Sequence, residues 1–107
     1  MINEIERALH YFKQNFNKDI SVQSYAKEHL MTPDWFIKSF KKIVKVTPMK
    51  YILSLRISAA KEYLEKTNKN ITEISNSVGY DNPLYFSRVF KKYTSLSPTE
   101  YKKTVKN

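Results

Sequence analysis

The sequence predicts an all-α fold of seven helices, arranged as two helix-turn-helix subdomains joined by a long linker helix. Three observations support this prediction. Apolar residues recur at spacings of three and four along almost the whole chain. Capping residues, three of them followed directly by proline, stand before several of these stretches, and one pattern of residues occurs twice. No segment alternates with period two, and no Asn-Gly or Asp-Gly pair marks a hairpin, so no strand is expected.

The first half of the chain is predicted to contain three helices. The first helix carries one apolar stripe and ends near residue 17. Ser21 caps the second helix. Thr32 followed by Pro33 starts the third, because the first position of a helix does not need the N–H that proline lacks. The residues expected on the buried faces are Ile2, Ile5, Leu9, Phe12, Phe16, Val22, Tyr25, Ala26, Phe36, Phe40 and Ile43.

Four more helices follow. The helix over residues 47–66 has more apolar positions than one stripe holds, so we expect it to pack on two sides. A capping box at Asn70 opens the fifth helix, which Gly79 ends. Asp81 is predicted to cap the sixth helix and Ser97 the seventh. The residues expected to face inward are Ile71, Ile74, Val78, Phe86, Val89, Phe90 and Tyr93.

An internal repeat divides the chain. Residues 36–42 (FIKSFKK) match residues 86–92 (FSRVFKK), 50 positions later, and the match extends into the next capped helix. Each copy has a short helix, a tight turn and a second helix, which is the geometry of a helix-turn-helix. The predicted organisation is a first subdomain over residues 1–46, a linker helix over residues 47–66 and a second subdomain over residues 67–107.

Composition excludes several classes of function. The single glycine excludes glycine-rich phosphate loops, and the absence of cysteine excludes disulfides, thiolate nucleophiles and zinc ribbons. The two histidines have no carboxylate at ligand spacing, so no metal, cofactor or enzymatic role is expected. No apolar run reaches the roughly 20 residues of a membrane span, and the N-terminus lacks the basic region of a signal peptide. We therefore expect a soluble, cytoplasmic protein.

The net charge of +9 is divided evenly, with +4 in residues 1–53 and +5 in residues 54–107. Two basic helices of this size fit the major groove of DNA, and two such units can read adjacent grooves about 34 Å apart. Arg88 suits guanine, Leu84 suits a thymine methyl group and Asp34 suits the cytosine amino group. The predicted DNA-contacting residues are Asp34, Ile37, Lys38, Lys41, Lys42, Pro83, Leu84, Ser87, Arg88, Lys91 and Lys92.

Each of these residues also has a plainer interpretation. Asp34 can simply stabilise a helix N-terminus, and Arg88 can pair with Asp81. The lysines can form an ordinary solvated face. Ile37 and Leu84 are both expected to be exposed, whereas Trp35 and Tyr85 are expected to pack in the core or at its rim rather than stack on bases.

Residues 71–102 resemble the signature of AraC/XylS-type transcription regulators, with Gly79, Arg88, the FKK segment and Ser97-Pro98 in order. Residues 55–64 (LRISAAKEYL) resemble the linker helix of that family, and residues 20–51 resemble its first helix-turn-helix. The chain departs from the family at Lys45 and Ser95, where glycine is usual, and in its apolar Pro83 and Leu84, where polar residues are common.

The resemblance implies a domain that binds double-stranded DNA and usually activates transcription, with RNA polymerase as a further partner. Residues 5–21 are similar to output domains of AraC-type response regulators. Because such domains normally end longer chains, we expect a fragment whose sensing or receiver domain is missing. The alternative is a basic helical module that binds a protein partner or an anionic membrane surface.

Overall fold

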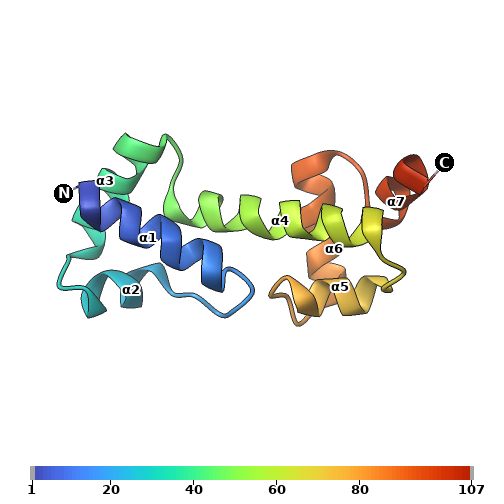
Figure 1. The fold of residues 1–107 in the computed structure, drawn as a ribbon, viewed down its shortest axis with the longest axis horizontal. Helices are drawn as coiled ribbons and strands as arrows, with labels where there is room; N and C mark the ends of the chain where they lie inside the picture. The colour runs from blue at the N-terminus through green and yellow to red at the C-terminus, as the bar shows by residue number, and fades with distance from the viewer. Residues whose placement is uncertain (1, 107) are drawn as a thin grey trace. The chain divides into compact units, whose positions relative to one another are not determined.

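The computed structural model describes residues 2–106, without the side chains of residues 2, 3 and 106. The described residues form seven α-helices and no strand, which confirms the predicted fold class (Figure 1). The predicted burial of Ile2, and residues 1 and 107 of the predicted subdomains, lie outside this description. The helices are α1 (Ile2–Asn15), α2 (Val22–Glu28), α3 (Pro33–Val44), α4 (Pro48–Lys66), α5 (Ile71–Ser77), α6 (Pro83–Thr94) and α7 (Pro98–Lys106).

The helices form two compact units, residues 1–55 and residues 56–107, and the division falls within α4. In the first unit α3 packs against both α1 and α2. Its core centres on the Phe12 ring, whose centroid lies 5.4 Å from Tyr25, 6.4 Å from Phe36 and 5.9 Å from Phe40. Ile52 of α4 completes this core. Aromatic rings from three helices therefore hold the first unit together through their large buried area.

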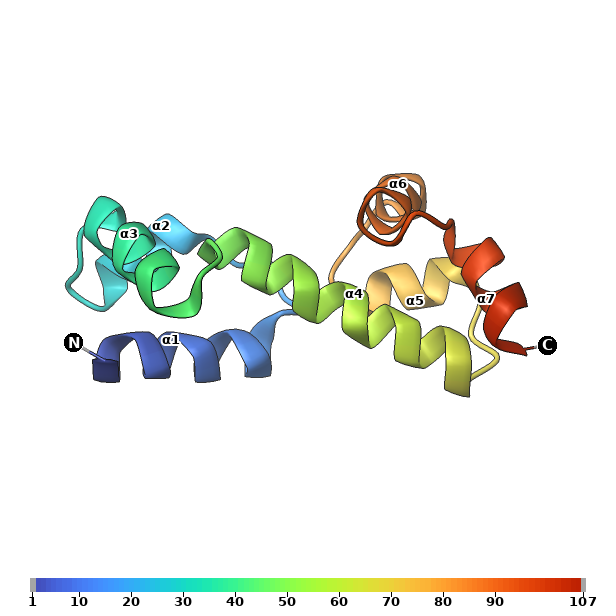
Figure 2. The ribbon, with the colours of Figure 1, turned by 90° about the horizontal axis from the view of Figure 1, so that it is seen from above.

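In the second unit α6 packs against α5 and α7. Figure 2 views α6 nearly end-on. Phe86 and Phe90 are fully buried with ring centroids 5.9 Å apart, and Phe90 contacts the Tyr101 ring at 5.6 Å. The buried Ile57 and Leu64 come from α4. Helix α4 therefore supplies buried residues to both units.

Local capping signals in the sequence are largely confirmed. The hydroxyl of Thr32 accepts from the Trp35 N–H at 3.2 Å, and Pro33 occupies the first turn of α3. A full capping box joins Asn70 and Glu73 at the start of α5. A second joins Ser97 and Glu100, and hydrogen bonds from Ser97 lower the pKa of the Glu100 carboxyl.

The cap of α6 was predicted at the wrong residue. Asn82, and not Asp81, is the N-cap: its Oδ1 accepts from the N–H groups of Leu84 at 2.9 Å and Tyr85 at 3.2 Å. Pro83 fixes the first position of the helix, so the residue directly before it is the one that reaches the free N–H groups. Asp81 remains exposed one position earlier.

Two residues predicted to face inward are exposed, Ile43 by 45% and Tyr93 by 50%. The buried stripe of α3 advances in steps of four from Phe36 through Phe40 to Val44, which packs against the first core. Ile43 lies about 100° away from Val44 around the helix and therefore outside this stripe. Tyr93 occupies the same place in α6, where Thr94 is half-buried instead.

Candidate nucleic-acid interface

The same turn positions the second helix of each helix-turn-helix. In the first unit the N–H of Met31 donates to the Ala26 carbonyl at 2.9 Å, and Leu30 has a positive φ of 61°. In the second unit the N–H of Tyr80 donates to the Ser75 carbonyl at 2.9 Å, and Gly79 has a φ of 101°. Both patterns are Schellman motifs, which end a helix sharply in a left-handed residue. The second helix of each unit therefore follows the first through an equivalent tight turn.

The first turn differs from the second in using leucine where the second uses glycine. Leu30 is 96% exposed, so no packing compensates its left-handed conformation. Lys45 and Ser95, at the ends of α3 and α6, also have positive φ values of 79° and 75°. These are the two positions where glycine is usual in the family that the sequence resembles. The chain thus adopts these left-handed conformations with leucine, lysine and serine in place of glycine, the residue that adopts them most easily.

We define the α3 surface as the five residues of α3 that the sequence singled out. Lys38 and Asp34 form an ion pair, with Nζ and Oδ2 3.2 Å apart and side chains 76% and 78% exposed. Lys41 and Lys42 are exposed in the last turns, whereas Ile37 is half-buried against the first core. The expectation that Ile37 is exposed is wrong, because it lies one residue from Phe36, at the edge of the buried stripe. The α3 surface consists of Asp34, Ile37, Lys38, Lys41 and Lys42.

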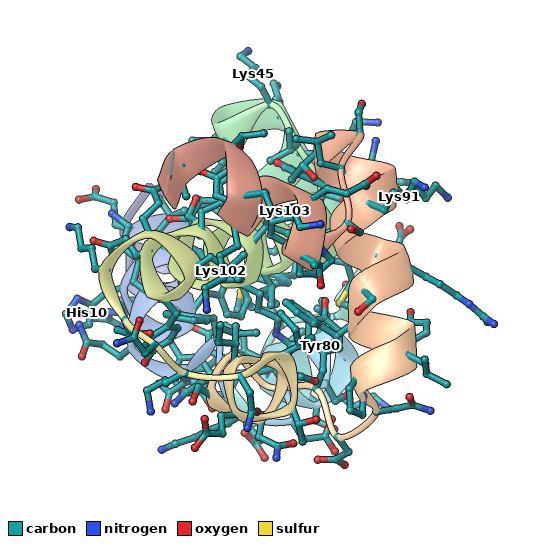
Figure 3. All side chains as sticks on the ribbon, turned by 90° about the vertical axis from the view of Figure 1, so that its right-hand side faces the viewer. His10, Lys45, Tyr80, Lys91, Lys102 and Lys103 are labelled. Atoms are coloured by element: carbon teal, nitrogen blue, oxygen red, sulfur yellow. The ribbon has the colours of Figure 1, made fainter. Side chains whose placement is uncertain are left out.

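The α6 surface is the matching set on the second unit. Leu84 is 73% exposed and Arg88 is exposed, and the first turn of α6 contains no acidic residue. Within residues 2–106, Arg88 has no ion pair, so the alternative pairing with Asp81 does not form. Figure 3 shows Lys91 projecting away from α6. The α6 surface consists of Pro83, Leu84, Ser87, Arg88, Lys91 and Lys92, of which Pro83 and Ser87 are half-buried.

Aromatic residues border both surfaces. Trp35 on α3 is 38% exposed and Tyr85 on α6 is 56% exposed. Tyr85 packs on Tyr80 with ring centroids 5.9 Å apart, and Tyr80 in turn contacts Phe86 at 5.7 Å and lies beside α6 (Figure 3). Tyr85 therefore packs at the rim of its core, as expected. Leu30, in the turn before α3, also protrudes into solvent at the position that matches Gly79.

Other kinds of site lack support in the described part of the chain. Among residues 2–106, no three His, Cys, Asp or Glu side chains are grouped as metal ligands would be. The imidazole of His29 stacks on Tyr25 with centroids 4.1 Å apart, and its Nδ1 forms a 2.8 Å hydrogen bond with the Tyr25 carbonyl oxygen. None of the helices formed by these residues has both the length and the apolar character of a membrane span.

Two helix-turn-helix motifs, each with an exposed cationic second helix, define a DNA-binding domain of transcription regulators. Comparison with known proteins gives the family. Residues 25–104 match the family profile described as a helix-turn-helix domain. The chain belongs to the AraC-type helix-turn-helix family.

Named relatives agree with this assignment. The chain is 35% identical to the lactose operon transcription activator of Staphylococcus xylosus over 103 residues, which is 95% of this chain and 37% of that protein. It is similar to the C-terminal domain of AraT, a response regulator from Geobacillus stearothermophilus, with a TM-score of 0.90 at 31% identity, covering 94% of this chain and 84% of that one. The chain thus spans less than two fifths of the length of the Staphylococcus relative.

The fold also occurs in a domain solved together with DNA. The DNA-binding domain of AdpA, in complex with a target DNA, has a TM-score of 0.87 at 17% identity and covers 94% of this chain and 90% of that one. At this identity the likeness concerns the fold alone.

Proposed function

We propose that this chain is the sequence-specific, double-stranded DNA-binding domain of a bacterial transcription regulator, and that the regulator is an activator. The observation that carries the proposal is the duplication of one surface. Both α3 and α6 follow the same left-handed turn, bury two phenylalanines on one side and expose a pair of lysines in the last turn. A basic helix held in this way is suited to a major groove.

In this proposal each unit inserts its second helix into its own major groove, and the two grooves are adjacent. The first two turns of α3 and α6 face base edges, since N-terminal residues of such helices reach the bases. The paired lysines of each last turn, Lys41 with Lys42 and Lys91 with Lys92, contact phosphates. Phosphate contacts supply most of the affinity, and base contacts supply selectivity.

The remaining features of the proposal follow from the class. The chain binds and carries out no reaction, and it acts in the cytoplasm, where bacterial promoters are located. An activator of this class also contacts RNA polymerase. The similarity to the C-terminal domain of a response regulator, and the longer relatives, support a parent protein with a sensing or receiver domain preceding this one.

Binding to duplex DNA across a range of salt concentrations tests the proposal. Fluorescence anisotropy would compare a duplex selected from a randomised pool with a scrambled duplex of equal composition. We expect a steep negative dependence of log K on log salt for both duplexes, and tighter binding to the selected one. The double substitution Lys91→Ala and Lys92→Ala should reduce the slope of log K against log salt by about 1.8 in magnitude. Each phosphate contact that is lost lowers the number of counterions released on binding by about 0.9.

A matched control uses a lysine outside both surfaces. Lys66 pairs with Glu62 on α4 at 3.1 Å, so Lys66→Ala removes a positive charge without touching α3 or α6. We expect this variant to keep the salt dependence of the unaltered protein. Binding to anionic vesicles with no binding to any duplex at low salt would refute the proposal and favour the basic module that binds a membrane surface.

A further inference from the structure

The α3 and α6 surfaces differ in the chemistry of their first two turns. At two matching positions, α3 carries Asp34 and Lys38, whereas α6 carries Leu84 and Arg88. Asp34 and Lys38 form an ion pair, while Leu84 is an apolar side chain exposed to 73%. The two helices have equivalent backbones, but α3 presents a hydrogen-bond acceptor beside a donor, whereas α6 presents an apolar side chain beside a cation.

We infer that the two helices read different base edges, so that the DNA site has two unlike halves: a C·G pair under α3, and a thymine beside a guanine under α6. This inference rests on the proposed function and specifies which base pairs its site contains.

An acidic side chain that faces DNA is costly unless a donor lies opposite it. A carboxylate is repelled by phosphates and by the acceptor atoms of base edges. In the major groove only the amino groups of cytosine and adenine donate hydrogen bonds. The carboxylate of Asp34 therefore favours sites with an amino group opposite it and rejects others, and the cytosine amino group is its usual partner in the major groove.

The ion pair also places a donor beside the carboxylate, which suits the acceptors that flank the amino group of either cytosine or adenine, so cytosine is assigned because it is the usual partner of a carboxylate. Because Nζ of Lys38 lies 3.2 Å from Oδ2 of Asp34, donor and acceptor stand side by side. A C·G pair presents the complementary arrangement, with the N4 amino group of cytosine next to O6 of guanine and N7 of guanine adjacent. Both partners are more than three-quarters exposed, so the base edge can meet the ion pair without first breaking it.

On α6 the exposed Leu84 presents an apolar side chain in the first turn. Its backbone is held in place, since its N–H donates to Oδ1 of Asn82 at 2.9 Å. The one apolar group on a base edge of the major groove is the thymine methyl, and burying it against leucine is favourable. Arg88, one turn later on the same face, has no ion pair within residues 2–106 and can direct its guanidinium at both acceptors of guanine.

Base analogues test this assignment on the duplex selected from a randomised pool. Each thymine would be replaced in turn by uracil, which removes only the methyl group. At one position we expect the replacement to weaken binding of the unaltered protein about fourfold, which corresponds to the free energy of burying one methyl group. The same replacement should have no effect on Leu84→Ala. Replacing the neighbouring guanine by 7-deazaguanine, which removes N7, should weaken the unaltered protein and leave Arg88→Ala unchanged.

The α3 half is tested with Asp34→Ala and Asp34→Asn. We expect the unaltered protein to prefer C·G over T·A at one position by about 5- to 150-fold, as for other specific base contacts. Asp34→Ala should lose this preference while it binds scrambled duplex more tightly, because a negative charge has been removed. Asp34→Asn should retain part of the preference, since its carbonyl still accepts. The side chains of Asp34, Leu84 and Arg88 are all exposed, so circular dichroism should show every variant folded.

The outcomes separate the inference from the proposed function. Equal binding to selected and scrambled duplexes, or no binding to either, refutes sequence-specific binding itself. Selective binding in which Leu84→Ala keeps every uracil effect, or Asp34→Ala keeps every base preference, overturns the two-edge assignment and leaves the proposed function intact.

Discussion

Leu30→Gly should stabilise the first unit, although leucine is ordinarily the larger contributor to stability. Leu30 has a φ of 61° and is 96% exposed, so its side chain strains the backbone without burying apolar area. A non-glycine residue in the left-handed region costs about 1–2 kcal/mol. Glycine loses about 0.5–1 kcal/mol more backbone entropy on folding. The net expectation is a gain of about 0.5–1 kcal/mol in the free energy of unfolding.

Urea unfolding followed by circular dichroism measures this difference as a higher midpoint with an unchanged slope. Leu30→Ala is the matched control: it shortens the side chain but keeps the β-carbon that causes the strain, so its midpoint should stay near that of the unaltered protein. Gly79→Ala should act in the opposite direction, with a loss of about 1 kcal/mol or more at a φ of 101°. If Leu30→Gly lowers the midpoint, strain in the first turn is not what limits the stability of this unit.

Three further predictions concern the second unit. Phe86→Ala should lower the free energy of unfolding by about 3–5 kcal/mol, because the ring is fully buried between Tyr80 and Phe90. Hydrogen exchange should then be fast for the amides of α5–α7. Equal acceleration in α1–α3 would mean that both units unfold together. Asn70→Ala should cost about 1 kcal/mol by urea unfolding, since it removes the side chain that accepts from the Glu73 N–H at 2.8 Å; an unchanged midpoint would show that the capping box does not contribute. The hydrogen bond from Tyr101 to Glu65, with burial and the carboxylate charge, raises the pKa of Tyr101 to about 12. Because this pKa lies above the ordinary value near 10, the resulting stabilisation is complete below pH 10 and is lost as pH rises towards 12. Thermal unfolding scans should therefore show that the midpoint temperature falls more steeply with rising alkaline pH for the unaltered protein than for Tyr101→Phe.

Much of the candidate interface could be predicted because the repeat and the helix periodicity are local signals. Apolar spacing placed Phe36, Phe40, Phe86 and Phe90 in the cores, and the positions between them had to face outward. Among the predicted contact residues, Pro83 and Ser87 are half-buried, and so is Ile37. Its position at the edge of the buried stripe depends on how far the neighbouring helices extend around α3, and no spacing rule reports that extent.

The sequence by itself determined the seven helices, their duplicated order and most of their caps. These features depend on contacts within a few residues: the capping box of Ser97 and Glu100 spans three positions, and a proline limits only its own turn. The family followed from the same residues, since its motif lies in one continuous segment.

Only the tertiary structure decided which side chains are covered, where leucine takes a left-handed conformation and which charges pair. Val44 is packed and Ile43 is exposed because the partner helices determine which side of the last turn is covered. Leu30 adopts a left-handed conformation because the Schellman hydrogen bonds and the start of α3 require it there, against its intrinsic preference. The ion pair of Asp34 and Lys38 likewise depends on side-chain geometry, which a spacing of four residues permits but does not impose.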